Sequence, residues 1–273
     1  FFIWIFLLNY IFCIHFILIM QVSLITCTYN SEKTIKDCCL SILSQSYENI
    51  EHIVLDKQSQ DLTLDILFKY KIKNQKIIQQ KNSGIYAAIN EGIKAAKGDV
   101  VGLLHSDDEL IERNVIKKIS KIFIEKKVDI IFSNLFYTKK YDKNKILRRW
   151  YSNLENGIQS NQSMIKKIQN GWMPPHTTLF IKKNLIEKIG YYNENFKISS
   201  DYDFIIRLFK IEDLKIFFLD EFTIKMRSGG ISNSSFKNIL IKMKEDYNIM
   251  RNHKLSPLRT IIFKNFSKIK QFF

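Results

Sequence analysis

Two neighbouring carboxylates, Asp107 and Asp108, follow the apolar run VVGLL in a chain whose formal net charge is +15. Like charges on adjacent residues are costly unless a cation lies against them. Carboxylate oxygens are the ligands that Mg²⁺ and Mn²⁺ prefer, and a metal held in this way can bind a diphosphate and stabilise a departing phosphate group. A solvated turn, or a cap for a helix that begins near residue 110, is the alternative. The place of the pair, directly after a buried-looking strand, favours the metal site.

Strands and helices alternate along the chain before this pair, and their order predicts where the pair lies. Short apolar runs predict strands at residues 22–28, 50–56, 76–80 and 100–104, and the stretches between them have helical character. Ser31 is the expected cap of the first helix, which should run to about Ser44. Such alternation predicts an α/β fold in which helices flank a mostly parallel central sheet.

Three polar side chains should gather at one edge of that sheet. Thr28, Asp56 and Asp107 each end or follow a predicted strand. Because the ligand crevice of a parallel sheet lies outside the carboxyl ends of its strands, we expect these three side chains to line one site.

The second half of the chain is less regular, but one stretch in it suggests a catalytic base. In ISSDYDF, Ser200 is followed three residues later by Asp203, as in a capping box that opens a helix. Asp201 would then lie in the first helical turn, where the helix dipole favours an ionised carboxylate, as a general base for an acceptor hydroxyl requires. The polar segment 139–162 has no clear period, which is typical of a functional or mobile segment.

Four ordered motifs resemble those of the family 2 glycosyltransferases of GT-A fold, in particular those of bacterial surface-polysaccharide synthesis. They are VSLITCTYN, the block GIYAAINEGI with AKGDVVGLLHSDD, PHTTLF, and SSDYDFIIRL. The resemblance covers roughly residues 20–235, with a nucleotide-binding half at 20–110 and an acceptor-binding, catalytic half at 111–235. It implies inverting transfer of a hexosyl or N-acetylhexosaminyl group from a nucleotide-diphosphate donor, a UDP-sugar, to a lipid-linked or glycan acceptor.

The resemblance also implies roles for single residues. Those that it places around the nucleotide sugar are Thr28, Asn30, Asp56, Asn82 and Asp107. Asp108 is implied to be the ligand of Mn²⁺ or Mg²⁺, and Asp201 the catalytic base. His176, which follows two prolines, is implied to contact the acceptor or the donor sugar, and a packed loop histidine is the alternative. Asn82 stands where the family often has an acid, and the turn after Asp56 reads KQSQD instead of a glycine-rich sequence, so the donor sugar stays open.

The two ends of the chain differ from the part between them. Residues 1–19 are nearly all apolar and uncharged, which is long enough for a marginal membrane span, but no basic region precedes them and Met20 follows. We expect the working protein to start at Met20, with a membrane anchor as the alternative. Residues 236–273 mix apolar side chains with nine Lys and Arg and two acids, which predicts a basic amphipathic helical tail on an anionic membrane surface. A solvated helix packed on the core is the alternative.

The excess of 42 Lys and Arg over 27 Asp and Glu suggests a polyanionic partner, either nucleic acid or a membrane face. No basic stripe interleaved with stacking aromatics is present, so we expect no nucleic-acid partner, and a basic binding module without catalytic activity remains the alternative function. A phosphotransferase is disfavoured because G-x-x-x-x-G-K-[ST] is absent. Four cysteines without C-x-x-C spacing suggest a reducing compartment, so we expect a cytoplasmic protein at the inner face of the membrane.

Overall fold

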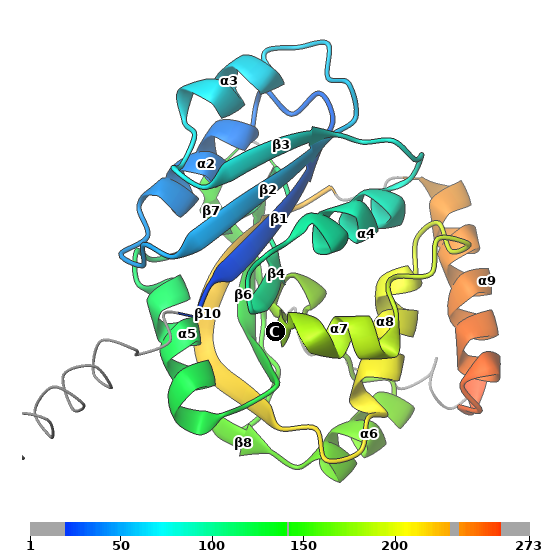
Figure 1. Ribbon diagram of the computed structural model, residues 1–273. Coiled ribbons are helices and arrows are strands. Elements are labelled where there is room, and N and C mark those ends of the chain that lie inside the picture. Colours follow the sequence, from blue (N-terminus) through cyan, green and yellow to red (C-terminus); the bar gives the residue numbers. More distant parts are fainter. Residues whose placement is uncertain (1–19, 141, 230–234, 258–273) are drawn as a thin grey trace, which may run out of the picture.

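The computed structural model describes residues 20–140, 142–229 and 235–257, so the apolar stretch 1–19 and the end of the basic tail lie outside it. One mixed sheet of ten strands runs through the middle of the molecule (Figure 1). Its order is β3-β2-β1-β4-β9-β6-β10-β5, with β7 paired to β6 and β8 to β10. Among the residues described, no helix is long and apolar enough to cross a membrane.

The predicted nucleotide-binding half forms a parallel strip of this sheet. Its strands are β1 (Val22–Thr28), β2 (Ile50–Asp56), β3 (Gln75–Gln79) and β4 (Val100–Leu103). Strand β1 pairs in parallel with both β2 and β4. Every residue of β1 and β2 is buried, because helices cover both faces of the sheet, and this explains why their sequences read as nearly continuous apolar runs.

Two hydrophobic clusters lie on the two faces of the sheet. Alternate residues of β1 point to opposite clusters, Ile25 and Cys27 to one and Val22 and Leu24 to the other. Helices α2 (Ile35–Leu43), α3 (Thr63–Lys69) and α5 (Val115–Lys126) cover one face, and α4 (Ile85–Ala95) covers the other (Figure 1). The α/β class predicted from the sequence is therefore confirmed.

Helix α2 begins later than expected, and Ser31 does not cap it. The Ser31 carbonyl accepts hydrogen bonds from the N–H groups of Thr34 and Ile35, which makes a turn before the helix. Thr34 is the N-cap and its side chain makes no cap hydrogen bond. The prediction of a Ser31 cap was therefore wrong, because the Ser31 hydroxyl lies instead 3.0 Å from the hydroxyl of Ser106.

The second half of the chain makes the sheet mixed. Strand β9 (Phe180–Lys182) lies antiparallel between β4 and β6 (Ile130–Lys139), and β10 (Ile216–Arg227) runs parallel to β6. Gly102 of β4 faces Phe180 of β9, where an added Cβ would lie 2.5 Å from Cε1 of the ring. The parallel arrangement predicted for the sheet thus holds for its first four strands, and antiparallel neighbours complete it.

The polar segment that lacked a period is regular structure. It contains β7 (Asp142–Trp150) and β8 (Gly157–Gln159), and helix α6 (Asn161–Gln169) begins at its end. Strand β7 pairs antiparallel with β6 and is largely exposed, and besides the hydrogen bonds of the hairpin it is held by Lys143, which bonds to Asp37 and Glu109. The short strand β5 (Glu109–Leu110) pairs with β10.

Three further elements belong to the second half of the chain. They are the 3₁₀ turn η1 (His176–Thr178), helix α7 (Lys183–Ile189) and helix α8 (Ser200–Phe209). The described part of the basic tail is helix α9 (Phe236–Asn252), which packs beside α8 (Figure 1). Ile249 and Met250 of α9 are fully buried, so this helix is part of the folded structure.

Candidate functional site

Thr28 and Asp56 lie side by side at the carboxyl edge of the parallel strands. They are partners in the register of β1 and β2, and both are almost fully buried. Asp56 accepts two hydrogen bonds from Ser59, one from its N–H at 2.9 Å and one from its hydroxyl at 2.6 Å. Ser59 thereby fixes the turn KQSQD, residues 57–61, to the end of β2. The hydroxyl of Thr28 has no partner among the described residues.

Asn30 connects the loops that follow β1 and β2. Its backbone has φ of +47°, a conformation that Asn tolerates better than most residues. Its N–H donates to the Ser59 hydroxyl at 2.9 Å, and its side-chain oxygen accepts from the N–H of Gln60 at 2.9 Å. Asn82 is exposed and its N–H donates to Glu91 at 3.1 Å. Within the described ranges, no hydrogen bond joins Asn82 to another predicted site residue.

Asp108 is a buried carboxylate without a side-chain partner in the part of the chain that is described. It is 0% exposed, and no side chain there donates a hydrogen bond to its carboxylate oxygens. Burial and the charge of Asp107 raise the pKa of Asp108 well above its usual range, although the backbone N–H groups of Arg227 and His105 and the charge of Arg227 oppose this. Asp107 is half-buried, and burial raises its pKa as well, although the charges of Arg227 and Lys140 oppose this. Such a carboxylate fits a divalent cation, which would satisfy both oxygens and offset the charge.

The protein would supply few of the ligands of such a cation. In the ranges described, no group of three or more His, Cys, Asp or Glu side chains is arranged to hold a metal ion. Mg²⁺ is typically bound by one or two carboxylates, with substrate phosphates and water completing its coordination. The Asp107–Asp108 pair matches that pattern.

An ionic network lies on the strands next to the pair. Arg227, the last residue of β10, bonds to Asp37 and, at 3.1 Å, to Glu109, and Lys143 bonds to the same two carboxylates at 2.7 and 3.2 Å. Arg227 is only 6% exposed. Sequence reasoning missed this network because its members are separated by up to 190 residues and none belongs to a recognisable motif.

Asp201 lies in the first turn of α8 and faces His176. Its Oδ2 is 3.6 Å from His176 Nδ1, and its Oδ1 accepts the N–H of Tyr202 at 2.9 Å. The hydroxyl of Tyr86 lies 3.5 Å from the same Oδ1 and donates to the Ile198 carbonyl at 2.5 Å. The side chain of Asp201 keeps 21% of its surface exposed, so one carboxylate oxygen remains available to a substrate.

His176 also connects the two halves of the chain. Its Nε2 lies 3.4 Å from Nε2 of His105, the residue that precedes Ser106 in the Asp107–Asp108 loop. Burial lowers the pKa of His176, although Asp201 opposes this, and burial with the neighbouring His176 lowers the pKa of His105 to about 3. Both imidazoles are therefore neutral at neutral pH.

The start of α8 is held by the basic tail and not by a capping box. Ser199 is the N-cap without a side-chain bond, and Glu245 of α9 accepts the N–H groups of residues 197, 198 and 199 at 2.7 to 2.9 Å. Asp203 accepts from Arg207 at 2.9 Å and pairs with His253 at 2.8 Å. The capping-box prediction for Ser200 and Asp203 was therefore wrong. Asp203 is structural, as expected, but through these two other partners.

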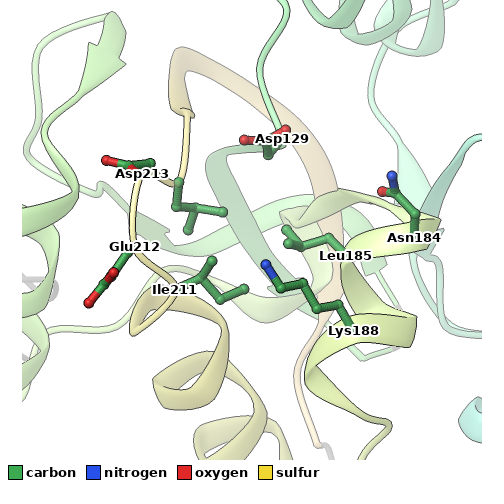
Figure 2. Close-up of a pocket in the computed structure, with 8 residues that line it drawn as sticks. Asp129, Asn184, Leu185, Lys188, Ile211, Glu212 and Asp213 are labelled. Atoms are coloured by element: carbon green, nitrogen blue, oxygen red, sulfur yellow. The ribbon is translucent and has the colours of Figure 1, made fainter.

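A cavity of about 250 Å³ is lined by residues other than these, and Figure 2 draws them as sticks. Its lining consists of Asp129, Asn184, Leu185, Lys188, Ile211, Glu212, Asp213 and Leu214. Asp129 immediately precedes β6, so the cavity is at the amino ends of the central strands. The predicted site residues are at the opposite edge of the sheet.

Comparison with known proteins agrees with this arrangement. The model of the family "Glycosyl transferase family 2" matches residues 23–190. An uncharacterised glycosyltransferase of Methanocaldococcus jannaschii is 26% identical over 221 residues, which are 78% of this chain and 72% of the relative. A UDP-Glc:alpha-D-GlcNAc-diphosphoundecaprenol beta-1,3-glucosyltransferase of Escherichia coli is 38% identical over 123 residues, 44% of this chain and 48% of that protein.

The fold agrees with that of a solved family structure. Residues 1–349 of Staphylococcus aureus TarS, in complex with UDP-GlcNAc, superpose with a TM-score of 0.67 at 22% identity, covering 90% of this chain and 70% of that one. The GT-A arrangement expected from the sequence is thus confirmed. Because the family model spans more than half of the chain, the chain belongs to glycosyltransferase family 2.

Proposed function

We propose that the protein is a metal-dependent, inverting glycosyltransferase of polysaccharide biosynthesis that moves a sugar from a UDP-sugar to a lipid-linked saccharide or glycan. The observation that carries the proposal is the contact of His176 with both Asp201 and His105. Through it, a candidate base from the second half of the chain lies across from the carboxylate pair of the first half. An inverting transfer needs this separation, because the acceptor attacks the face of the sugar opposite the leaving diphosphate.

The donor would lie along the carboxyl edge of β1, β2 and β4. Thr28, Asn30 and Asp56 would bind the base and ribose, since their loops are fixed to one another through Ser59. Asp107 would lie beside the ribose and diphosphate. Asn82, which is exposed at the rim, would contact the donor sugar. The complex of TarS with UDP-GlcNAc supports a uridine donor.

Asp108 would hold Mn²⁺ or Mg²⁺, and Asp107 would lie next to the ion. The metal would act as a Lewis acid that stabilises the charge of the departing nucleoside diphosphate. The fit rests on the two oxygens of Asp108, which have no side-chain partner among the described residues, and on its burial. Arg227 and Lys140 add positive charge near Asp107.

Asp201 would accept the proton of the acceptor hydroxyl. Its Oδ1 accepts the Tyr202 N–H, and its Oδ2, which lies 3.6 Å from His176 Nδ1, would accept the proton of the acceptor. His176 would contact one of the sugars beside Asp201. The lipid-linked acceptor named for the E. coli relative supports an acceptor of this class, and the sugar transferred to it would be a hexose or an N-acetylhexosamine.

Replacing the base tests the proposal directly. Asp201→Asn should lower kcat by about 10²- to 10⁴-fold, the usual cost of removing a positioned base, while UDP still binds with Mn²⁺ in calorimetry. Asp65→Asn, which changes an exposed carboxylate of α3, is the matched control and should leave both measurements unchanged. An Asp201→Asn enzyme with full turnover would remove Asp201 from the mechanism.

The acceptor class also suggests a location at an anionic membrane. Helix α9 exposes an apolar stripe, which consists of Phe236, Ile239, Leu240, Met243 and Tyr247. Their spacing puts them on one helical face, and Lys237, Lys242 and Lys244 flank it. Asp246, Ile249 and Met250 of α9 are buried, and α9 packs on α8, the helix that carries Asp201. A membrane against this stripe would therefore lie near the acceptor side of the site.

Vesicle flotation tests the membrane part of the proposal. The wild-type protein should float with anionic vesicles more than with neutral ones, and Met243→Glu should reduce this binding. Phe68→Glu, at an exposed apolar position of α3, serves as control and should have no effect. Equal binding to both kinds of vesicle would exclude an electrostatic contribution, and unchanged flotation of Met243→Glu would exclude the α9 stripe.

A further inference from the structure

Two histidines from different halves of the chain meet beside the candidate base. His105 lies between β4 and the Asp107–Asp108 loop, and His176 opens the turn η1. Their Nε2 atoms are 3.4 Å apart, and the ring centroids are 5.7 Å apart with the rings tilted by 57°. The two rings meet through their Nε2 atoms, so the contact has the geometry of a hydrogen bond and not of stacked rings.

The protonation of the pair follows from its surroundings. A hydrogen bond between the two Nε2 atoms requires one of them to carry the proton of its ring and the other to be bare. Because His176 Nδ1 faces a carboxylate oxygen of Asp201, the proton of His176 is favoured on Nδ1, which leaves its Nε2 as an acceptor. His105 must then be the donor.

The backbones on both sides of the contact are fixed. Asp108 donates its N–H to the carbonyl of His105 at 2.9 Å, so the ring of His105 is tied to the position of that carboxylate. On the other side, Thr178 of η1 accepts the N–H of Ser133 at 3.2 Å and donates to the Ser133 carbonyl at 3.1 Å. The hydrogen bond between the rings is thus a direct connection between two anchored segments.

We propose that His105 is a positioning residue, which donates through Nε2 to His176 and thereby holds the Nδ1–H of His176 against Asp201. This inference rests on the proposed function, in which Asp201 is the base. It adds that the hydrogen bond from His105 sets the orientation of the base relative to Asp108. His105 itself touches neither substrate nor metal in this assignment.

Two substitutions separate this role from simple packing. His105→Leu removes the donor, whereas His105→Gln keeps an N–H donor near the position of Nε2. His105→Leu should lower kcat by about 10- to 100-fold, the scale of a misplaced catalytic group, with KM for the donor and the affinity for UDP within about twofold of wild type. His105→Gln should recover most of the turnover.

A spectroscopic measurement tests the hydrogen bond without relying on activity. Nitrogen-15 NMR of histidine-labelled protein should show His176 protonated on Nδ1 in the wild type and in His105→Gln, and a mixture of tautomers in His105→Leu. A wild-type His176 protonated on Nε2 would overturn the proposal. Full kcat in His105→Leu, or an equal loss in the Leu and Gln variants, would overturn it as well.

The outcomes also distinguish this inference from the proposed function. If wild type transfers sugar and Asp201→Asn does not, while His105→Leu keeps its kcat, the inference fails and the proposed function stands. If wild type transfers no sugar from any nucleotide sugar, the proposed function fails and the catalytic role of His105 fails with it. In that case the tautomer of His176 still decides whether the hydrogen bond exists. UDP binding and a melting curve for each variant show that the chain is folded.

Discussion

Asp108→Asn should make the metal-free protein more stable, although it removes the proposed metal ligand. Asp108 is 0% exposed, its oxygens have no side-chain partner within the described residues, and burial and Asp107 raise its pKa. A carboxyl whose pKa is higher in the folded state than in the unfolded state binds more protons when folded. The folded state therefore loses stability as pH rises above the unfolded pKa, about 3.9, towards the folded pKa. Without metal, this loss is therefore larger at pH 8 than near the unfolded pKa.

The size of the effect follows from the missing partners. Leaving a buried polar group unpaired costs about 1–3 kcal/mol, and a charged group costs more, whereas the amide of Asn carries no charge. We expect Asp108→Asn to raise the free energy of unfolding in EDTA at pH 8 by about 1–3 kcal/mol. For a chain of this size that corresponds to an increase in Tm of about 2 to 12 °C.

Metal stabilises the wild-type protein relative to the variant. With UDP and Mn²⁺ at about 100 times its Kd, the wild-type protein should gain about 2.7 kcal/mol, and Asp108→Asn should gain nothing comparable. Thermal melts of both proteins in EDTA and in Mn²⁺ make the comparison, with Asp65→Asn as the control. A variant that is less stable than wild type in EDTA, or that gains as much from Mn²⁺, would refute the reasoning.

Two residues around α8 give further tests by urea unfolding. Glu245→Gln should lower the free energy of unfolding by about 1.5–3 kcal/mol, because it removes a charged acceptor of three N–H groups. The control Glu125→Gln breaks only the exposed ion pair with Lys121 and should lower the free energy of unfolding by under about 0.5 kcal/mol. Equal losses in the two variants would contradict a stabilising contact of Glu245 with the start of α8. Burial would raise the pKa of Asp203, but hydrogen bonds from His253 and Arg207 outweigh this effect and lower the pKa. Asp203→Asn should therefore lower the free energy of unfolding by about 1.5–3 kcal/mol at pH 7, and its difference from wild type should narrow below about pH 4. A difference in the free energy of unfolding that stays constant down to pH 3 would contradict a lowered pKa of Asp203.

The first half of the fold was predictable because its signals are local. Strands β1, β2 and β4 are buried on both faces, so their apolar runs could be read directly, and Gly84, with φ of +103°, opens α4 as its sequence indicates. The meeting of Thr28 with Asp56 follows from the parallel register of these strands. The contact of Asp201 with His176 was not predictable from spacing, since two separate segments of the acceptor half make it.

The errors arose where a distant residue supplies the hydrogen bond. The local sequence predicted that Ser200 caps α8. In the structure Glu245, 45 residues later in the sequence, accepts the N–H groups before α8. Strand β7 has no apolar period because both of its faces are largely exposed, and it is defined by its pairing with β6. In the same way, Ser31 was expected to cap α2, but its hydroxyl lies against Ser106.

Strand β9 limits how members of this family can be recombined. A crossover at residue 110, between the two predicted halves, would join strand β4 from one parent to a β9 from another. Gly102 leaves space for the ring of Phe180, and a Cβ at that position would lie 2.5 Å from it. A parent with a larger residue at 102 would therefore collide with this β9. Chimaeras that exchange acceptor specificity must inherit Gly102 and Phe180 from the same parent.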